Sequence, residues 1–473
     1  MQWLRIRSVE SLGGGEHSSL KRTLGAVDLT LLGIGCIIGT GVFVLTGVAA
    51  ARYAGPGLML SFALAGLACA FAALVYAELA AMVPVSGSAY TYSYATMGEA
   101  VAWIVGWNLV LEYAVSAGAV AAGWSGYFTG ILGQLGVVLP AAITNVPAEG
   151  GVMDVPATAI ALLVTGLLVN GVRHGARVNA ALVFVKLFAI LLFLALAGPK
   201  VDADLWTPFA PFGWQGIATG AAIIFFAYIG FDAVATAAEE TRDPQRNLPI
   251  GIIASLLICT AIYLTVAAVL TGVAPYTSLD VKEPVAFALR LIGYDFGAAV
   301  VAAGALAGIT TVLLVLIFAQ ARIFFVMARD GLLPTFLSRI NAAHGTPQIA
   351  TLLTGIGVAG VAGFLPLGAI AELSNIGTLF AFVAVSLGVM ILRRARPDIV
   401  RPFRTPVLWF VGPAAVASCG YLMISLPATT WVRFGIWSVI GAIVYAAYGY
   451  RRSPLRRDLA APTPESAAGS PSA

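Results

Sequence analysis

Long apolar stretches recur along the whole of this 473-residue sequence. A helix needs about 20 apolar residues to cross the hydrocarbon core of a bilayer. Apolar runs bounded by charges or by Gly and Pro clusters occupy residues 24–50, 57–82, 98–121, 155–171, 179–198, 215–238, 249–272, 296–320, 347–364, 370–392, 406–426 and 431–450. The sequence therefore predicts an all-α polytopic membrane protein with twelve transmembrane helices.

The composition excludes several classes of protein. Hydrophobic residues make up 60% of the chain and charged residues only 10%, whereas a soluble domain carries about 25% charged residues. A soluble enzyme, a secreted disulfide scaffold and a nucleic-acid binder could not keep so much apolar surface in water. The four cysteines lie in separate apolar runs and the three histidines in polar connections, so we expect no disulfide, metal site or cofactor.

The basic residues set the expected orientation. With the N-terminus inside, 20 Lys and Arg residues are assigned to the cytosolic side and 5 to the outer side, and the remaining one, Lys186, lies inside span five. Cytosolic loops retain Lys and Arg, so both termini should face the cytosol of a cell (plasma or inner) membrane. Residues 1–23 contain no cleavable signal, and residues 451–473 form a predicted disordered tail.

Two spans carry features that should break their helices. The first contains four glycines between residues 33 and 41, and the sixth contains Gly230 followed two residues later by Asp232. Unpaired backbone groups at membrane depth are tolerated where they line a cavity, and paired broken helices point to a transporter site. Close helix packing is the alternative role for these glycines.

The two predicted breaks begin two halves of similar length. Residues 24–198 hold spans one to five and residues 215–392 hold spans six to ten. An odd number of spans in each half makes the two repeats inverted in the membrane. Residues 406–450, with spans eleven and twelve, lie outside this 5+5 repeat.

Several segments carry a resemblance to a known family. Residues 33–43, 84–92, 111–113, 226–232, 239–249 and 327–334 are similar to motifs of the amino acid-polyamine-organocation superfamily. Within it, the chain resembles bacterial members of the cationic amino acid transporter family over all twelve spans. The resemblance implies a LeuT-like fold with an amino acid bound between spans one, three, six and eight.

The two breaks offer complementary backbone groups to such a substrate. Exposed N–H groups at Gly39, Thr40 and Gly41 open a half-helix whose positive end suits a carboxylate. The carbonyls of Phe226, Ala227 and Ile229 in span six are expected to be free and suit an ammonium. The resemblance adds Ser116 and Phe231 as side chains that line the site, with Tyr228 as a weaker candidate. Phe231 is expected to close over the substrate or to pack in the core. The predicted substrate-binding residues are Ile38, Gly39, Thr40, Gly41, Ser116, Phe226, Ala227, Ile229 and Phe231.

Lys186 is the most informative single residue. A charged amine in mid-span costs about 2.5–3.5 kcal/mol on the mildest insertion scale, which makes it a functional hypothesis by default. In related proton-coupled members a span-five lysine replaces a sodium ion, meeting span-one carbonyls and span-eight hydroxyls, here Thr310 or Thr311. We expect Lys186 to carry the coupling proton. A structural ammonium paired with Glu112 or with helix carbonyls is the alternative.

Other acidic residues have less certain roles. Glu112 is either part of the coupling route or a neutral acid that fixes helix packing. Glu78, near the cytosolic end of span two, should reach the interface or an arginine there. The charged residues between 239 and 246 form either a gate or a solvated loop.

The predicted function is import of L-amino acids by alternating access. We expect small neutral side chains or broad specificity, with cationic substrates as a further option, and coupling to protons without sodium. An amino acid/metabolite exchanger of the same fold is the alternative. An enzyme would need a nucleophile-base set or a metal cluster, and a channel would need polar rings along a pore. The expected partners are the substrate, the proton and membrane lipid; an accessory subunit is left open.

Overall fold

The computed structural model describes residues 22–83, 88–171, 176–341 and 346–452. Helices and their connections make up these segments, and their only strand-like pairing is a single bridge between Leu24 and Thr241. Within these described segments, eight helical stretches are long and apolar enough to cross a membrane, and four shorter apolar helices accompany them. The all-α membrane architecture is confirmed, while the count of twelve spans stays a prediction.

The main helices follow the predicted runs in order. The first half contains α2 (Ala26–Ile37), α3 (Thr46–Ala49), α4 (Leu58–Met82), α5 (Ser88–Thr96), α6 (Glu99–Gln134), α7 (Ala141–Thr144), α8 (Val155–Val169) and α9 (Ala176–Ala197). The second half and the last helices are α10 (Gly213–Ile224), α11 (Pro244–Val273), α12 (Pro284–Leu291), α13 (Asp295–Arg329), α14 (Gln348–Phe364), α15 (Leu367–Ala395), α16 (Leu408–Ile424), α17 (Ala428–Val444) and α18 (Tyr450–Arg452).

Both predicted helix breaks are present. Helix α2 ends at Ile37, the backbone of Ile38 is extended, and a π-helical segment resumes at Gly41–Leu45. Helix α10 continues into a 3-10 turn, η7 (Phe225–Tyr228), and a second 3-10 segment, η8 (Asp232–Glu240), follows the interruption. Gly230 lies in that interruption with φ +119°, a conformation that L side chains rarely adopt.

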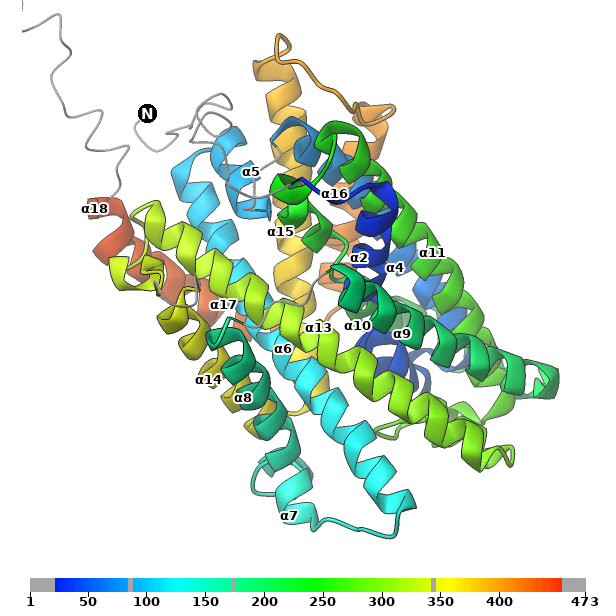
Figure 1. Ribbon diagram of the computed structural model, residues 1–473. Coiled ribbons are helices and arrows are strands. Elements are labelled where there is room, and N and C mark those ends of the chain that lie inside the picture. The colour runs from blue at the N-terminus through cyan, green and yellow to red at the C-terminus, as the bar shows by residue number, and fades with distance from the viewer. Residues whose placement is uncertain (1–21, 84–87, 172–175, 342–345, 453–473) are drawn as a thin grey trace, which may run out of the picture.

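The broken helices lie inside a frame of continuous ones (Figure 1). Helices α6 and α13 cross the molecule side by side, α8 packs on α14, and α4 packs on α11. Helix α2 contacts α9, α11 and α13, so the first break is enclosed by other helices. Glycines permit the close approaches, since a Cβ on Gly33 would lie 2.4 Å from the Ser255 hydroxyl of α11.

The two ends of the molecule carry different connections. Helix α7 lies at the end opposite α5 and the α15–α16 connection (Figure 1). At the α7 end, Arg52 pairs with Asp280, and Lys282 donates to the Thr144 carbonyl at 2.7 Å. At the opposite end, the backbone of Leu24 bonds to Glu240 and Arg242, which ties the start of α2 to the end of η8.

Some predictions lie outside what the structure tests. Residues 1–21 and 453–473, which hold most of the predicted terminal segments, are outside the described residues, as are residues 84–87 of the second motif. The assignment of 24–198 and 215–392 as inverted repeats, with 406–450 appended, stays a prediction. So does the gating role of the loop between residues 239 and 246.

Candidate functional site

The two breaks meet backbone to backbone. A Cβ built on Gly41 would lie 2.3 Å from Ala227 Cα, and one built on Gly230 would lie 3.0 Å from the Cys36 carbonyl carbon. The distance at Gly41 lies well inside van der Waals contact, where a real Cβ atom would not fit. The distance at Gly230 is tight, and its φ of +119° is a conformation that L side chains rarely adopt. Glycine at both positions is therefore what allows the interrupted helices to touch.

The first break leaves backbone donors without acceptors. Among the described residues, no carbonyl accepts from the N–H groups of Gly39, Thr40 and Gly41. The Thr40 hydroxyl is also buried without a hydrogen-bond partner. Ile38, the predicted substrate-binding residue that precedes them, has a carbonyl that accepts from the Lys186 ammonium. The donors open a helical half-span whose positive end faces the break, as an anion-binding site requires.

The second break has fewer free backbone carbonyls than predicted. The Phe226 carbonyl accepts from the Ile229 N–H at 3.2 Å, and the Ala227 carbonyl accepts from the Tyr263 hydroxyl at 2.9 Å. The prediction that both carbonyls are free is wrong, because the chain closes a 3-10 turn and because α11 supplies a hydroxyl. Each carbonyl keeps a second lone pair. The Ile229 carbonyl accepts from no donor in the described part of the chain.

Tyr263 joins the two breaks and was missed in the sequence. Its single hydroxyl proton is shared between the Ile37 carbonyl, at an oxygen–oxygen distance of 2.8 Å, and the Ala227 carbonyl, at 2.9 Å. The tyrosine is fully buried in α11. In the sequence, Tyr263 looks like any aromatic residue of an apolar span. Its role is revealed only by the hydrogen bonds of its hydroxyl to the two broken helices.

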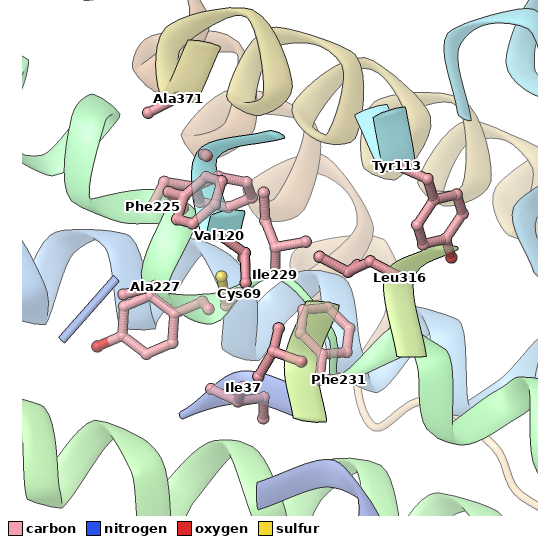
Figure 2. Packing of buried hydrophobic residues seen from close by; sticks show 14 of the residues in the cluster. Ile37, Cys69, Tyr113, Val120, Phe225, Ala227, Ile229, Phe231, Leu316 and Ala371 are labelled. Atoms are coloured by element: carbon pink, nitrogen blue, oxygen red, sulfur yellow. The ribbon is translucent and has the colours of Figure 1, made fainter. Parts of the chain in front are cut away.

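The aromatic candidates lie in the core around the breaks. The Phe231 ring is fully buried, 5.0 Å from the Phe382 ring and 6.2 Å from the Tyr76 ring. Figure 2 shows Phe231 with Ile37 and Ile229 among the buried side chains. The packing fits the core role for Phe231, and a lid role stays a prediction. Tyr228 donates to the Phe62 carbonyl at 2.9 Å, which holds it against α4.

Ser116 faces α15. Its hydroxyl lies 2.5 Å from that of Ser374, and both residues are fully buried. One residue further on, Asn375 donates to the Ala222 and Ile223 carbonyls at 2.8 Å each, which braces the end of α10 just before its break. Asn375 is a polar amide within an apolar span, so the argument that selected Lys186 would have found it.

Lys186 lies directly behind the first break. Its ammonium donates to the carbonyls of Gly35 at 2.6 Å and Ile38 at 3.1 Å, and the side chain is fully buried. A Cβ on Gly308 of α13 would lie 2.6 Å from Lys186 Cγ, so that glycine makes room for the lysine. The predicted contact with span-one carbonyls is confirmed.

The predicted hydroxyl partners of Lys186 turn elsewhere. Thr310 donates to the Leu306 carbonyl and accepts from Trp124 at 2.9 Å, while Thr311 donates to the Gly308 carbonyl at 2.7 Å. Threonines in a helix commonly return their hydroxyl bond to the preceding turn. The structure therefore brings neither threonine into hydrogen bonding with Lys186.

Glu112 belongs to a separate acidic pair. It is buried in α6 without an ion-pair or hydrogen-bond partner for its oxygens among the described residues, beside Thr378, whose hydroxyl donates to Ser374. The nearby acid is Asp232 at the start of η8, which accepts from the Tyr113 hydroxyl at 3.2 Å. Glu112 and Lys186 are not paired, so the predicted pairing with Glu112 is wrong for this structure. The other form of that alternative, a structural ammonium held by helix carbonyls, agrees with the contacts of Lys186 and stays open.

Glu78 meets arginines, as predicted. Its fully buried carboxylate pairs with Arg393, lies 3.5 Å from Arg401 Nε, and accepts from the Thr405 backbone N–H at 2.8 Å. A buried carboxylate in an apolar surround requires such compensation. Glu78 therefore anchors the α15–α16 connection rather than the central site.

The arrangement defines a class of protein. A bundle of apolar helices encloses two broken helices whose free backbone groups, a buried ammonium and buried acids lie at membrane depth. Irregular backbone survives there where it lines a binding site. These features are those of a multi-pass membrane permease.

Comparison with known proteins gives the family. Residues 24–450 match the family model described as amino acid permease. The chain belongs to the amino acid permease family, consistent with the resemblance to the amino acid-polyamine-organocation superfamily.

Named relatives extend over nearly the whole chain. It is 47% identical to the methylthioribose transporter of Bacillus subtilis (strain 168), over 96% of this chain and 99% of that protein. It is 48% identical to the branched-chain amino acid permease BcaP of the same organism, again over 96% and 99%. The vacuolar cationic amino acid transporter 4 of Arabidopsis thaliana is 39% identical over 83% of this chain and 67% of that protein.

Proposed function

We propose that this permease moves L-amino acids across the cell membrane by alternating access, driven by protons and independent of sodium. The observation that carries the proposal is the set of acceptor-free N–H groups at Gly39, Thr40 and Gly41, set against the second break. The N–H groups bind the substrate carboxylate, and the Ile229 carbonyl, with the second lone pairs of Phe226 and Ala227, accepts from its ammonium.

The surroundings favour a neutral side chain. Ile37, Ile229 and Phe231 are apolar and buried at the breaks, and a pocket of that kind gains from burying an aliphatic substrate side chain. The relative named for branched-chain amino acids fits this choice. Cationic substrates are the second candidate, because Glu112 and Asp232 are buried acids without a cationic partner among the described residues.

Lys186 provides the link to protons. Its ammonium donates to two carbonyls on the last turn of α2 and its C-cap, immediately before the free N–H groups. The Lys186 ammonium thus occupies the position beside the Gly35 and Ile38 carbonyls where a bound sodium ion would otherwise be needed. Loss of the proton leaves the Lys186 amine uncharged and with fewer N–H donors. Its hydrogen bonds to the carbonyls of the first break are then weaker, which allows the half-helix to move. Glu112 serves as a second group on the proton route.

The orientation follows from charge. The 20 to 5 excess of basic residues in segments on one side supports a cytosolic location for that side, because cytosolic loops retain Lys and Arg; α7 would then lie outside. Arg52 and Lys282, two of the residues assigned to the outside, lie at the α7 end.

Proton coupling is tested in sealed liposomes with sodium-free buffer. We expect an inward proton gradient to drive uptake of labelled L-leucine by the wild type, and Lys186→Met to abolish the response to the gradient. Lys200→Met, which removes an exposed lysine from a connection, is the matched control and should retain it. Thermal unfolding of each variant shows whether it folds.

Two results would contradict the coupling scheme. Uptake by Lys186→Met that still follows the proton gradient would remove Lys186 from the proton route. Wild-type uptake that needs internal substrate and ignores the gradient would make this protein an exchanger, with Lys186 as a structural ammonium.

A further inference from the structure

A small basic cavity lies away from the central site. Its volume is about 120 Å³, and it is lined by Arg393, Pro397, Arg401 and Arg404. Arg393 lies in the last turn of α15, and the other three belong to the connection that leads to α16. In Figure 1 this connection lies at the end of the molecule opposite α7.

The positive charge of this cavity is only partly compensated. Among the described residues, Glu78 is the one acid that pairs with its arginines, reaching Arg393 and Arg401. Arg404 is exposed and has no ion-pair or hydrogen-bond partner in the described part of the chain. Three guanidinium groups against one carboxylate leave two positive charges at the cavity.

Arg401 is built into the cavity wall. Its guanidinium donates to the Ile399 carbonyl at 2.7 Å and to the Arg396 carbonyl at 2.8 Å, and only 8% of the residue is exposed. Burial lowers the pKa of Arg401 and the positive Arg393 and Arg404 lower it further, with Glu78 opposing them. The cavity therefore holds fixed positive charge that an anion would relieve.

The same connection exposes apolar side chains on both sides of the arginines. Val400 is 81% exposed and Val407 75% exposed. Trp409 and Phe410 are exposed at the start of α16, and the Arg394 guanidinium lies 4.6 Å from the Trp409 ring centre. Exposed tryptophan next to basic residues at the end of a span is typical of the membrane interface. The cavity thus lies at headgroup depth, with apolar side chains facing the acyl chains.

We propose that this cavity binds the phosphate of an anionic phospholipid headgroup in the adjacent leaflet. Guanidinium groups recognise phosphate oxygens with paired N–H donors, and basic pockets beside transmembrane helices bind anionic headgroups. A free phosphate shares this chemistry, but the exposed Val400, Val407 and Phe410 give a lipid further contacts that a free ion would not use. The bound headgroup would hold the α15–α16 connection against the membrane surface.

Native mass spectrometry of delipidated protein in detergent tests the assignment. The protein is titrated separately with phosphatidylglycerol, with phosphatidylcholine of the same acyl chains and with inorganic phosphate. We expect the wild type to prefer phosphatidylglycerol and Arg404→Gln to weaken that binding about five-fold, the worth of one basic residue near an anionic surface. Binding of phosphatidylcholine should not change.

Arg396→Gln is the matched control. Arg396 lies in the same connection and carries the same charge, but it pairs with Asp398 and does not line the cavity. Arg404 has no ion-pair or hydrogen-bond partner to lose in the described segments, so its variant should unfold at the wild-type temperature. Equal losses in both variants, or no preference for phosphatidylglycerol, would overturn the proposal. Phosphate binding that depends on Arg404 without that lipid preference would overturn the lipid as the ligand.

Discussion

Gly41→Ala is the sharpest perturbation of the central site. A Cβ at this position would lie 2.3 Å from Ala227 Cα and 3.0 Å from the Ala227 nitrogen. Carbon atoms in favourable contact are about 3.5–4.0 Å apart, so the two breaks must separate by about 1 Å to admit it. Since Ala227 contributes backbone there, no change of side-chain rotamer relieves the clash.

The expected cost has two parts. Overpacking a close contact destabilises a protein by about 1–3 kcal/mol, which lowers the unfolding temperature. Separation of the breaks also moves the N–H groups away from the substrate carboxylate, and a hydrogen bond to a charged group contributes about 1.5–3 kcal/mol. Loss of one such bond raises the Kd about 10- to 100-fold.

Binding of labelled L-leucine to purified Gly41→Ala and Gly39→Ala measures this effect. The three atoms nearest to a Cβ on Gly39 all belong to the Val312 side chain, with Cγ2 at 3.1 Å, and that side chain adjusts at small cost. We expect Gly39→Ala to bind within a few-fold of the wild type, because a small steric cost well below 1.4 kcal/mol changes affinity by less than ten-fold. Wild-type affinity in Gly41→Ala, or an equal loss in both variants, would refute the account of the paired breaks.

Three further substitutions test the contacts that hold the site and its frame, each read by thermal unfolding in detergent. Tyr263→Phe removes the hydroxyl that donates to both broken helices and should cost about 1–3 kcal/mol, because two buried carbonyls lose a donor; an unchanged unfolding temperature would show that the bridge contributes nothing. Glu78→Gln leaves the buried arginines uncompensated and should cost about 3–5 kcal/mol, whereas a stabilised variant would contradict that charge assignment. Asp154→Ala removes the N-cap of α8, whose carboxylate accepts from Ala157 N and the Ser125 hydroxyl, and should cost about 1–2 kcal/mol; Asp154→Asn retains a capping oxygen and should lose less.

The broken helices could be predicted because their cause is local. Glycine clusters and the Gly230–Asp232 pair mark positions where a helix in lipid is interrupted, and the breaks occur there. Lys186 was predictable as a functional residue for a related reason, since a charged amine in mid-span is costly. Its contact with the span-one carbonyls was expected from the family resemblance. The helix breaks and the cost of a mid-span lysine can each be argued from the residues of one segment placed in a lipid bilayer.

Contacts between segments could not be predicted in the same way. Whether the Ala227 carbonyl is free depends on Tyr263 from α11, and the partner of Ser116 comes from α15. Thr310 and Thr311 had the right residue type, but the rotation of α13 directs their hydroxyls to other partners. Span ends also differ, since α6 continues to Gln134 beyond the predicted residue 121; a helix does not need to stop where it has crossed the hydrocarbon core.

Competition for counterflow of labelled L-leucine in sealed liposomes tests the central claim most directly. The two breaks are proposed to hold both ends of a zwitterion, so L-isoleucine should compete, whereas leucinol, which lacks the carboxylate, and 4-methylpentanoate, which lacks the ammonium, should not. Methylthioribose carries neither group and should also fail to compete. Exchange of methylthioribose without exchange of leucine, or full competition by leucinol, would contradict recognition of an amino acid by the paired breaks.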